Sequence, residues 1–152
     1  MTEFLETTID KFTFRVATDR LYSLEGLWVL QVGPGNNQVR IGVTDFVQQH
    51  SGDCAFATPK PVGTALKQGE EIAALETVKV NIAFASPVSG TVVAINGELE
   101  LSPEKVNQSP FDDGWLAEVE ASHWEAERAG LLAPAAYFKA MQDAARAELD
   151  KP

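Results

Sequence analysis

One short motif occurs twice in the middle of the chain, and it constrains the fold more than any other feature. Pro61-Val62-Gly63-Thr64-Ala65-Leu66, followed by Gly69-Glu70, resembles Pro87-Val88-Ser89-Gly90-Thr91-Val92-Val93, followed by Gly97-Glu98. The alignment requires one inserted residue, Ser89, and another before Gly97. Small turn residues beside apolar strand positions predict two β-halves packed about a pseudo-twofold axis. Chance similarity is the alternative, because repeat arrays normally need three or more units.

The segment between the two copies alternates strictly between apolar and other residues. Val78, Val80, Ile82 and Phe84 take every second position, and Lys79 lies among the residues between them. Periodicity alone therefore predicts one long strand across residues 71–85, with Lys79 on its solvent-facing side. No Asn-Gly dipeptide marks a tight turn inside this segment, whereas Asn96-Gly97 carries that signal at the end of the second copy.

The first third of the chain is also rich in strand patterns. Alternation of Phe12, Phe14 and Val16 with polar residues predicts a half-buried strand. Two apolar runs, 27–32 and 39–43, flank the turn residues 33–37 and predict a hairpin. Thr44-Asp45 then predicts the capped start of a short helix that stops at Gly52.

The last third predicts helices. Ser102-Pro103-Glu104 marks one helix start, and Ser122 with Glu125 forms a capping-box pattern ahead of a stop at Gly130. Pro134 opens a C-terminal helix over 134–150 with one apolar stripe, formed by Tyr137, Phe138, Met141, Ala145 and Leu149. Strands followed by helices predict an α+β architecture that is mainly β, a barrel or sandwich with peripheral short helices.

Length and charge narrow the range of functions that this chain could have. The chain has 152 residues, which predicts one domain over 1–152, and its net charge is 12 − 22 = −10. That balance argues against nucleic acid and anionic membranes as partners and favours partners with basic faces. The acidic N-terminus lacks a signal-peptide pattern, no apolar run approaches the length of a membrane span, and Cys54 is the only cysteine. A cytoplasmic location is expected.

No self-sufficient active site emerges from the residues. Two histidines and one cysteine cannot fill a four-ligand zinc site without carboxylates, so no metal site and no catalytic residues are predicted. His50 and Cys54 lie four apart, but Gly52 interrupts any helix that would align them. A Cys54 nucleophile stays open as an alternative, although a small buried thiol is the favoured interpretation.

Several short motifs are informative when they are taken together and in order. Gly42-Val43-Thr44-Asp45 is followed by Gly69-Glu70-Glu71 and by Glu76-Thr77-Val78-Lys79. Ser86–Val92, Asn96, Val106–Pro110 and Asp113–Leu116 continue the series. In this order the motifs resemble the glycine cleavage system H-protein family, across roughly residues 20–140, with 1–19 as an N-terminal extension.

The resemblance implies a lipoyl-type β-sandwich, a barrel-sandwich hybrid, with Lys79 on a hairpin and amide-linked to lipoic acid. Glu76, Thr77, Val78 and Val80 would then flank the lysine and help a lipoate ligase or lipoyl transferase recognise it. Their alternative role is that of ordinary residues beside a turn. The implied protein is a non-catalytic carrier and a monomer, whose lipoyl arm moves an intermediate between partner redox or transferase enzymes. Lipoylation would change the net charge from −10 to −11, one positive charge fewer.

Three positions depart from the family pattern. Phe46-Val47 replaces His-Ala after Thr-Asp, Gly26-Leu27-Trp28 replaces His-Glu-Trp, and Val80 replaces Ala after the lysine. Loss of a His and a Glu removes hydrogen-bonding groups suited to an amine. The sequence thus predicts an apolar groove for the arm, with Phe46, Leu27 and Trp28 as candidates to line it.

These departures favour the divergent H-like lipoate-binding proteins associated with heterodisulfide-reductase-like sulfur oxidation, with a sulfur intermediate on the arm. The alternative is an authentic glycine cleavage H-protein, which carries an aminomethyl group between decarboxylase, aminomethyltransferase and dihydrolipoamide dehydrogenase. A plain interaction module with an unmodified Lys79 is a third hypothesis.

Overall fold

The computed structural model describes residues 2–32 and 37–149. The elements, in chain order, are β1 (Phe4–Ile9), β2 (Phe12–Ala17), β3 (Leu21–Tyr22), β4 (Leu27–Gln31), β5 (Gln38–Val43), α1 (Asp45–Ser51), β6 (Cys54–Pro59), β7 (Ala65–Leu66), β8 (Glu71–Thr77), β9 (Asn81–Ala85), β10 (Gly90–Ile95), the 3₁₀ helix η1 (Gly97–Glu100), α2 (Lys105–Gln108), β11 (Ala117–Ala121), α3 (Trp124–Glu127), the 3₁₀ helix η2 (Arg128–Gly130) and α4 (Pro134–Leu149).

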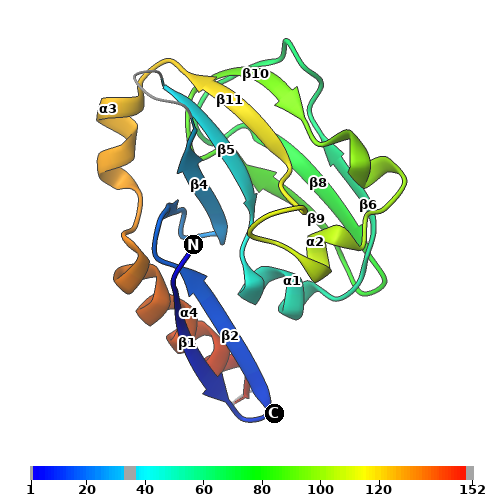
Figure 1. Ribbon diagram of the computed structural model, residues 1–152, viewed down its shortest axis with the longest axis vertical. Coiled ribbons are helices and arrows are strands. Elements are labelled where there is room, and N and C mark those ends of the chain that lie inside the picture. The colour runs from blue at the N-terminus through cyan, green and yellow to red at the C-terminus, as the bar shows by residue number, and fades with distance from the viewer. Residues whose placement is uncertain (1, 33–36, 150–152) are drawn as a thin grey trace.

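Two antiparallel sheets enclose the main core, as Figure 1 shows. One sheet has the strand order β3-β4-β5-β11-β10-β7, and the other has the order β6-β8-β9. Buried aliphatic side chains from both sheets form one cluster, which includes Ile41, Ile72, Leu75 and Val119. The predicted class is therefore confirmed: a mainly β sandwich with short helices and a C-terminal helix.

The two copies of the repeated motif lie side by side. Strands β7 and β10 pair antiparallel with Ala65 opposite Thr91, and the amide of Val92 donates to the carbonyl of Thr64 at 2.9 Å. In the alignment of the two copies, Thr64 corresponds to Thr91 and Ala65 corresponds to Val92. Ala65 therefore lies opposite the counterpart of Thr64, and Thr64 is hydrogen-bonded to the counterpart of Ala65. An antiparallel pair with this register has a local twofold axis, which gives the repeat a structural meaning beyond chance similarity.

Residues 71–85 form a hairpin, so the single long strand predicted from periodicity is wrong. Strands β8 and β9 are antiparallel, with Leu75 opposite Ile82 and Glu76 opposite Asn81. Residues 78–80 make the turn, as the family resemblance implied. Alternation continues through the turn although Val78 and Val80 are exposed there, and only Ile82 and Phe84 of the series pack against the core.

The predicted hairpin of 27–32 and 39–43 is confirmed as β4 and β5, and most of its turn (33–36) lies outside the described residues. Helix α1 also matches its prediction. The Thr44 hydroxyl accepts from the amide of Val47 at 3.3 Å, and Gly52 ends the helix with a φ of 86°. A positive φ suits glycine because it has no Cβ.

The sequence signals after residue 95 predict the local structure less accurately. The Asn96 side chain accepts a hydrogen bond from the amide of Glu98 and caps η1, so Asn96-Gly97 starts a 3₁₀ helix instead of a tight hairpin turn. Helix α2 begins at Lys105, two residues after Pro103. The capping box predicted at Ser122 does not form, since His123 is the N-cap of α3 and makes no side-chain cap bond.

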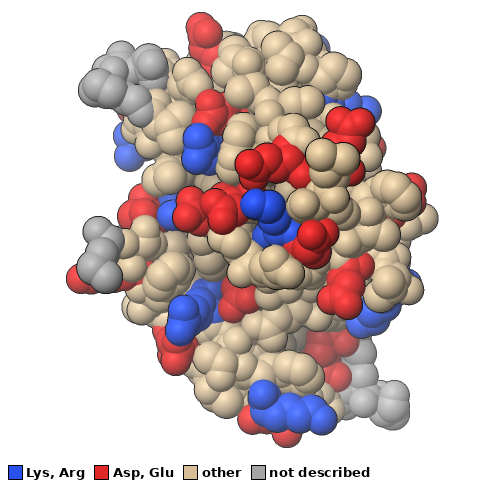
Figure 2. All heavy atoms as spheres, turned by 45° about the vertical axis from the view of Figure 1, so that its right-hand side comes forward, with Lys and Arg blue, Asp and Glu red and all other residues tan. Residues whose placement is uncertain are grey.

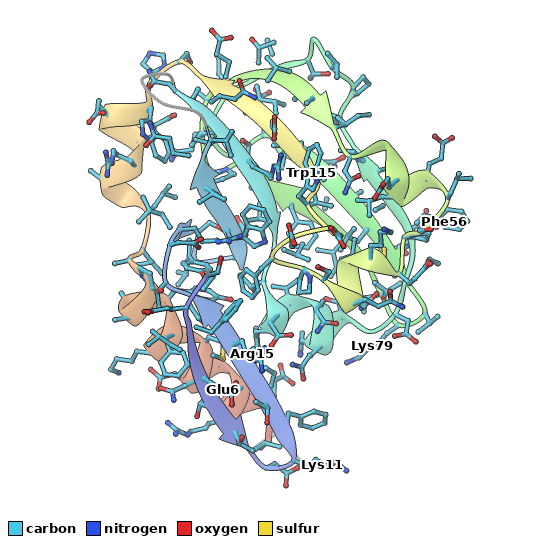
Figure 3. The ribbon with its side chains drawn as sticks, in the orientation of Figure 1. Glu6, Lys11, Arg15, Phe56, Lys79 and Trp115 are labelled. Carbon is cyan, nitrogen blue, oxygen red and sulfur yellow. The ribbon has the colours of Figure 1, made fainter. Side chains whose placement is uncertain are left out.

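A second core joins the N-terminal extension to the end of the chain. Strands β1 and β2 form a separate hairpin that lies along α4 (Figure 1), with Arg15 Nε and Glu6 Oε2 paired across it at 2.9 Å (Figure 3). Phe14 and Val16 are buried against this helix, in a cluster with Tyr137 and Met141. Residues 2–19 thus build one side of the protein below the sandwich.

Candidate functional site

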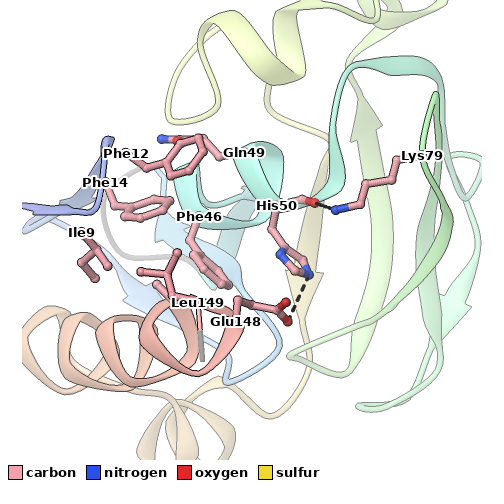
Figure 4. A pocket seen from close by; sticks show the side chains of 10 residues that line it. Ile9, Phe12, Phe14, Phe46, Gln49, His50, Lys79, Glu148 and Leu149 are labelled. Atoms are coloured by element: carbon pink, nitrogen blue, oxygen red, sulfur yellow. Dashed lines mark hydrogen bonds and ion pairs between the residues drawn. The ribbon is translucent and has the colours of Figure 1, made fainter. Parts of the chain in front are cut away.

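Lys79 stands at the tip of the β8–β9 hairpin, against the C-terminal end of α1. Its Nζ donates to the main-chain oxygen of His50, in the last turn of that helix, at 3.1 Å (Figure 4). The amide of Val78 donates to the oxygen of Asp53 at 3.0 Å. The end of α1 and the loop after it therefore hold the hairpin tip on two sides of the lysine.

The turn itself is built by Thr77. Its Oγ1 accepts from the amides of Val80 at 2.9 Å and Lys79 at 3.2 Å, and its amide donates to the oxygen of Val80 at 2.8 Å. The hydroxyl also lies 2.7 Å from the oxygen of Ser51, to which it can donate. A threonine side chain that binds the backbone two and three residues onward replaces the Asn-Gly chemistry sought in the sequence.

The residues flanking the lysine are exposed. Val78 retains 80% of its accessible surface and Val80 retains 39%, and Glu76 and Lys79 are also exposed. Only Thr77 is half-buried, as its hydrogen bonds require. Exposed valines on both sides of a lysine offer an incoming protein apolar contacts next to the ammonium group.

A groove of about 190 Å³ opens beside Lys79. Its walls come from the β1–β2 hairpin, α1 and α4 (Figure 4). The lining residues are Ile9, Phe12, Phe14, Phe46, Gln49, His50, Lys79, Ala145, Glu148 and Leu149. The Phe46 ring packs between Phe14, at 5.6 Å between ring centroids, and the stacked imidazole of His50, also at 5.6 Å.

The three residues predicted to line the groove do not lie together in the structure. Phe46 lines the groove, whereas Leu27 and Trp28 are both 0% exposed and lie in the two cores. Trp28 donates its indole N–H to the oxygen of Pro110 at 2.8 Å, and the Arg20 guanidinium lies over its ring at 4.6 Å. Leu27 and Trp28 are therefore core residues, and the prediction that they line the groove is wrong.

The groove walls supplied by the chain ends are not apparent from the sequence. Alternation places Phe12 and Phe14 only in a strand, and periodicity places Leu149 only in a helix stripe. The available signal was weak: Leu149 continues the apolar stripe of α4 yet keeps half of its surface exposed. An apolar residue left open at the end of a buried stripe can indicate a surface groove.

Cys54 has the environment of a structural thiol. It is 7% exposed, and burial raises its pKa to about 11, against an ordinary value of 9.0. The imidazole of His50 stacks on Phe46, and its Nε2 lies 3.9 Å from Glu148 Oε1, on the groove side of α1. A thiolate is therefore disfavoured at neutral pH, which weakens the nucleophile hypothesis.

Residues 2–32 and 37–149 contain neither a cluster of metal-ligating side chains nor a membrane-spanning helix. Within these ranges, no three His, Cys, Asp or Glu side chains are grouped so that they could hold a metal ion. Within the same ranges, no helix is both long and apolar enough to cross a membrane.

Comparison with known proteins identifies the family of this chain. The model of the glycine cleavage H-protein family matches residues 20–144. The chain belongs to this family. The family resemblance found in the sequence is thereby confirmed, while the comparisons give no information on the sulfur-oxidation subgroup.

Several relatives are similar over most of their length. The glycine cleavage system H protein of Oceanobacillus iheyensis is 41% identical over 125 residues, covering 82% of this chain and 96% of the relative. That of Deinococcus radiodurans is 38% identical over 120 residues, covering 79% and 92%. The crystal structure of such a protein from Mycobacterium marinum superposes with a TM-score of 0.70 at 26% identity, covering 80% of this chain and 95% of that one.

Proposed function

We propose that this protein is a lipoyl carrier of the glycine cleavage system, with lipoic acid amide-linked to Lys79 and an aminomethyl group as cargo. The names of the relatives favour this pathway over the sulfur-oxidation interpretation of the sequence. The proposal rests on one observation. Lys79 is exposed at the tip of a hairpin that is hydrogen-bonded to α1, and its side chain lines a groove.

The hydrogen bond made by Lys79 Nζ is one that an amide can also make. This nitrogen donates to one main-chain oxygen, that of His50, and an amide N–H retains a hydrogen for such a bond. Amide formation removes an ammonium group whose ordinary pKa of about 10.4 keeps it charged and hydrated at neutral pH. When bound, a lipoyl group supplies a dithiolane that alternates between disulfide and dithiol.

The chain's own residues would present the modified lysine to an enzyme. Thr77 fixes the turn, and Val78, Val80 and Glu76 stand exposed beside the lysine for a ligase to contact. Rigid presentation lowers the conformational entropy lost when an enzyme docks on the tip. The roles of these flanking residues in recognition stay predictions.

The partners would be the lipoate ligase and enzymes with basic docking faces. The net charge is −10, and carboxylates are spread widely over the face shown in Figure 2. Such a surface speeds encounter with cationic partners without requiring tight apolar burial, which suits repeated docking. A cytoplasmic monomer and a single carrier domain stay predictions as well.

Intact-protein mass after co-expression with a lipoate ligase tests the attachment. We expect the mass of one lipoyl group on the wild type and none on the Lys79→Arg variant. Lys105→Arg is a matched control, because Lys105 is likewise a surface lysine but pairs with Glu98 at 3.3 Å. An unmodified wild type, under conditions that lipoylate an authentic H-protein, would refute the proposal.

A second candidate is the sulfur carrier. It is favoured by one observation, the apolar Phe46 at the wall of the groove where the family pattern has His. A reconstituted glycine cleavage assay separates the two candidates. We expect the lipoylated protein to replace an authentic H-protein; inactivity of the fully lipoylated form, together with neighbouring genes for heterodisulfide-reductase-like subunits, would favour the sulfur role.

A further inference from the structure

The loop between α1 and β6 supports the tip of the lysine hairpin. The oxygen of Asp53, in this loop, accepts the amide of Val78 at 3.0 Å. Gly52 lies against the lysine itself, since a Cβ placed on this glycine would stand 3.5 Å from the Cβ of Lys79, an ordinary van der Waals contact. The position of residues 52–53 therefore determines where the backbone of the lysine lies.

Asn107 holds this loop in place from α2, the short helix beside α1 (Figure 1). The amide of Cys54 donates to Asn107 Oδ1 at 2.8 Å, and Asn107 Nδ2 donates to the oxygen of Gly52 at 3.0 Å. The same nitrogen lies 3.1 Å from Gln48 Oε1, to which it donates its second hydrogen. The carboxamide thus uses its acceptor and both of its donor hydrogens, and the adjacent Val106 is buried in the main core.

The two bonds from Asn107 to the loop fix the direction of the carbonyl between them. They join the oxygen of Gly52 and the N–H of Cys54, the groups on either side of Asp53. A residue of a parallel β-strand bonds to its neighbour in the same pattern, and the residue that it brackets turns its own groups to the opposite side. Asp53 accordingly presents its oxygen to Val78. A reversed carboxamide would set Oδ1 against the oxygen of Gly52, so one orientation of Asn107 supports this arrangement.

We propose that Asn107 is a positioning residue for the modification of Lys79. The proposal rests on the lipoyl carrier function and adds a residue on which presentation of the lysine depends. Asn107 acts on the hairpin through Asp53 and Gly52, the residues that meet the hairpin tip. This role accounts for the asparagine in the 106–110 motif. A purely structural residue would instead stabilise the fold without a particular effect on the hairpin.

Asn107→Asp tests the proposal with almost no change of size. It keeps an acceptor for the amide of Cys54 but places a second acceptor, with a negative charge, against the oxygens of Gly52 and Gln48. The side chain can then no longer bracket Asp53 in the same geometry. Asn107→Ser removes the carboxamide without adding a charge, and it is measured alongside so that the test does not depend on one variant.

Asn96→Asp is the matched control, because Asn96 also binds main-chain groups with both ends of its carboxamide. Its Nδ2 donates to the oxygens of Asp113 at 2.7 Å and Trp115 at 2.9 Å, and its Oδ1 accepts the amide of Glu98 at 3.2 Å. These partners belong neither to the 52–54 loop nor to the lysine hairpin. The control therefore loses comparable hydrogen bonds elsewhere in the protein.

Two measurements report on the hairpin, and urea unfolding reports the overall stability of each variant. Hydrogen exchange of the Val78 amide should be at least about tenfold faster in both Asn107 variants, the factor that loss of one or two net hydrogen bonds gives a local opening equilibrium. With a purified lipoate ligase, the KM for the protein should rise about threefold to tenfold while kcat stays within about twofold, because fewer molecules present the lysine in the form that binds. Asn96→Asp should lower the overall stability and leave both quantities close to their wild-type values.

An unchanged exchange rate for Val78 in both Asn107 variants, or an equal rise in Asn96→Asp, would overturn the proposal and leave Asn107 a structural residue. An unchanged KM would overturn it as well. A wild type that gains no lipoyl mass instead rejects the carrier function. Exchange at Val78 is measured on the unmodified protein, so the two failures are distinguishable.

Discussion

The hydroxyl of Thr77 lies 2.7 Å from the main-chain oxygen of Ser51, so the tip of the lysine hairpin is bonded to the last residue of α1. The same oxygen atom of Thr77 also accepts the amides of Lys79 and Val80. One side chain therefore determines both the shape of the turn and its position on the protein. A valine has the same shape and none of these hydrogen bonds.

We predict that Thr77→Val lowers the free energy of unfolding by about 1–2 kcal/mol, because it leaves half-buried backbone groups without their partner. Lipoylation of Lys79 should become slower, since the tip is no longer held in one conformation. Urea unfolding and the rate of mass increase with a lipoate ligase measure the two effects. Thr64→Val is the control, because its hydroxyl also caps a turn, at 2.6 Å from the oxygen of Pro61. Equal lipoylation rates for the two variants would contradict the assigned role of Thr77.

Cys54 should resist alkylation in the folded protein. It is 7% exposed, and burial raises its pKa to about 11, so little thiolate is available at neutral pH. We expect labelling by iodoacetamide to be at least about tenfold slower in native buffer than in urea, in line with the preference of alkylation for exposed thiolates. Fast native labelling would revive the hypothesis of a nucleophilic cysteine.

Stability should fall in alkaline solution. Burial raises the pKa of Tyr137 from 10.0 to about 12, and that of Cys54 from 9.0 to about 11. The folded state then keeps protons that the unfolded chain has lost, so the stabilisation is complete below about pH 9 and is lost as pH rises to about 12. Each group contributes a slope of about 1.4 kcal/mol per pH unit within its own window. Urea unfolding across this range measures the slope, and Cys54→Ala should flatten its lower half; a constant free energy would refute the assignment.

Local patterns predicted the parts of the fold that local chemistry determines. The capped α1 and the β4–β5 pair follow from adjacent residues, such as Thr44 and Gly52. The β8–β9 hairpin could not be found that way, because its turn is made by the Thr77 hydroxyl binding the amides of Lys79 and Val80, within a run of alternating apolar residues that contains no Gly or Pro. Periodicity cannot register a contact of this kind, and only the family resemblance supplied the turn.

The candidate site shows the same limit. Lys79 was identified by its motif, and Phe46 by its departure from the family pattern. Glu148 and Phe12 could not be placed beside them, because the groove depends on how both ends of the chain pack on α1. Leu27 was misplaced because both sides of β4 are covered by a core, with Leu27 in one core and Trp28 in the other, and the motif does not show this.

Gly42, in the Gly-Val-Thr-Asp motif, lies opposite Trp28 on the neighbouring strand, and both residues are buried. A Cβ at position 42 would stand 2.5 Å from Trp28 Cζ2, closer than carbon atoms approach one another. The indole cannot move aside easily, since it is bonded to Pro110 and covered by Arg20. We predict that Gly42→Ala lowers the free energy of unfolding by about 2–3 kcal/mol through overpacking. Gly97→Ala, where a Cβ meets nothing within 4 Å, should change it by about 0.5 kcal/mol or less.

A double-mutant cycle isolates the contact between Gly42 and Trp28. Trp28→Phe alone should destabilise the protein by creating a cavity and by leaving the oxygen of Pro110 without its donor. In the double variant, however, the smaller ring makes room for the methyl group that Gly42→Ala introduces. We therefore expect the combined loss, measured by urea unfolding, to be at least about 1 kcal/mol smaller than the sum of the two single losses. Strict additivity would mean that the added methyl group clashes with something other than the indole, and the motif glycine would then need a different explanation.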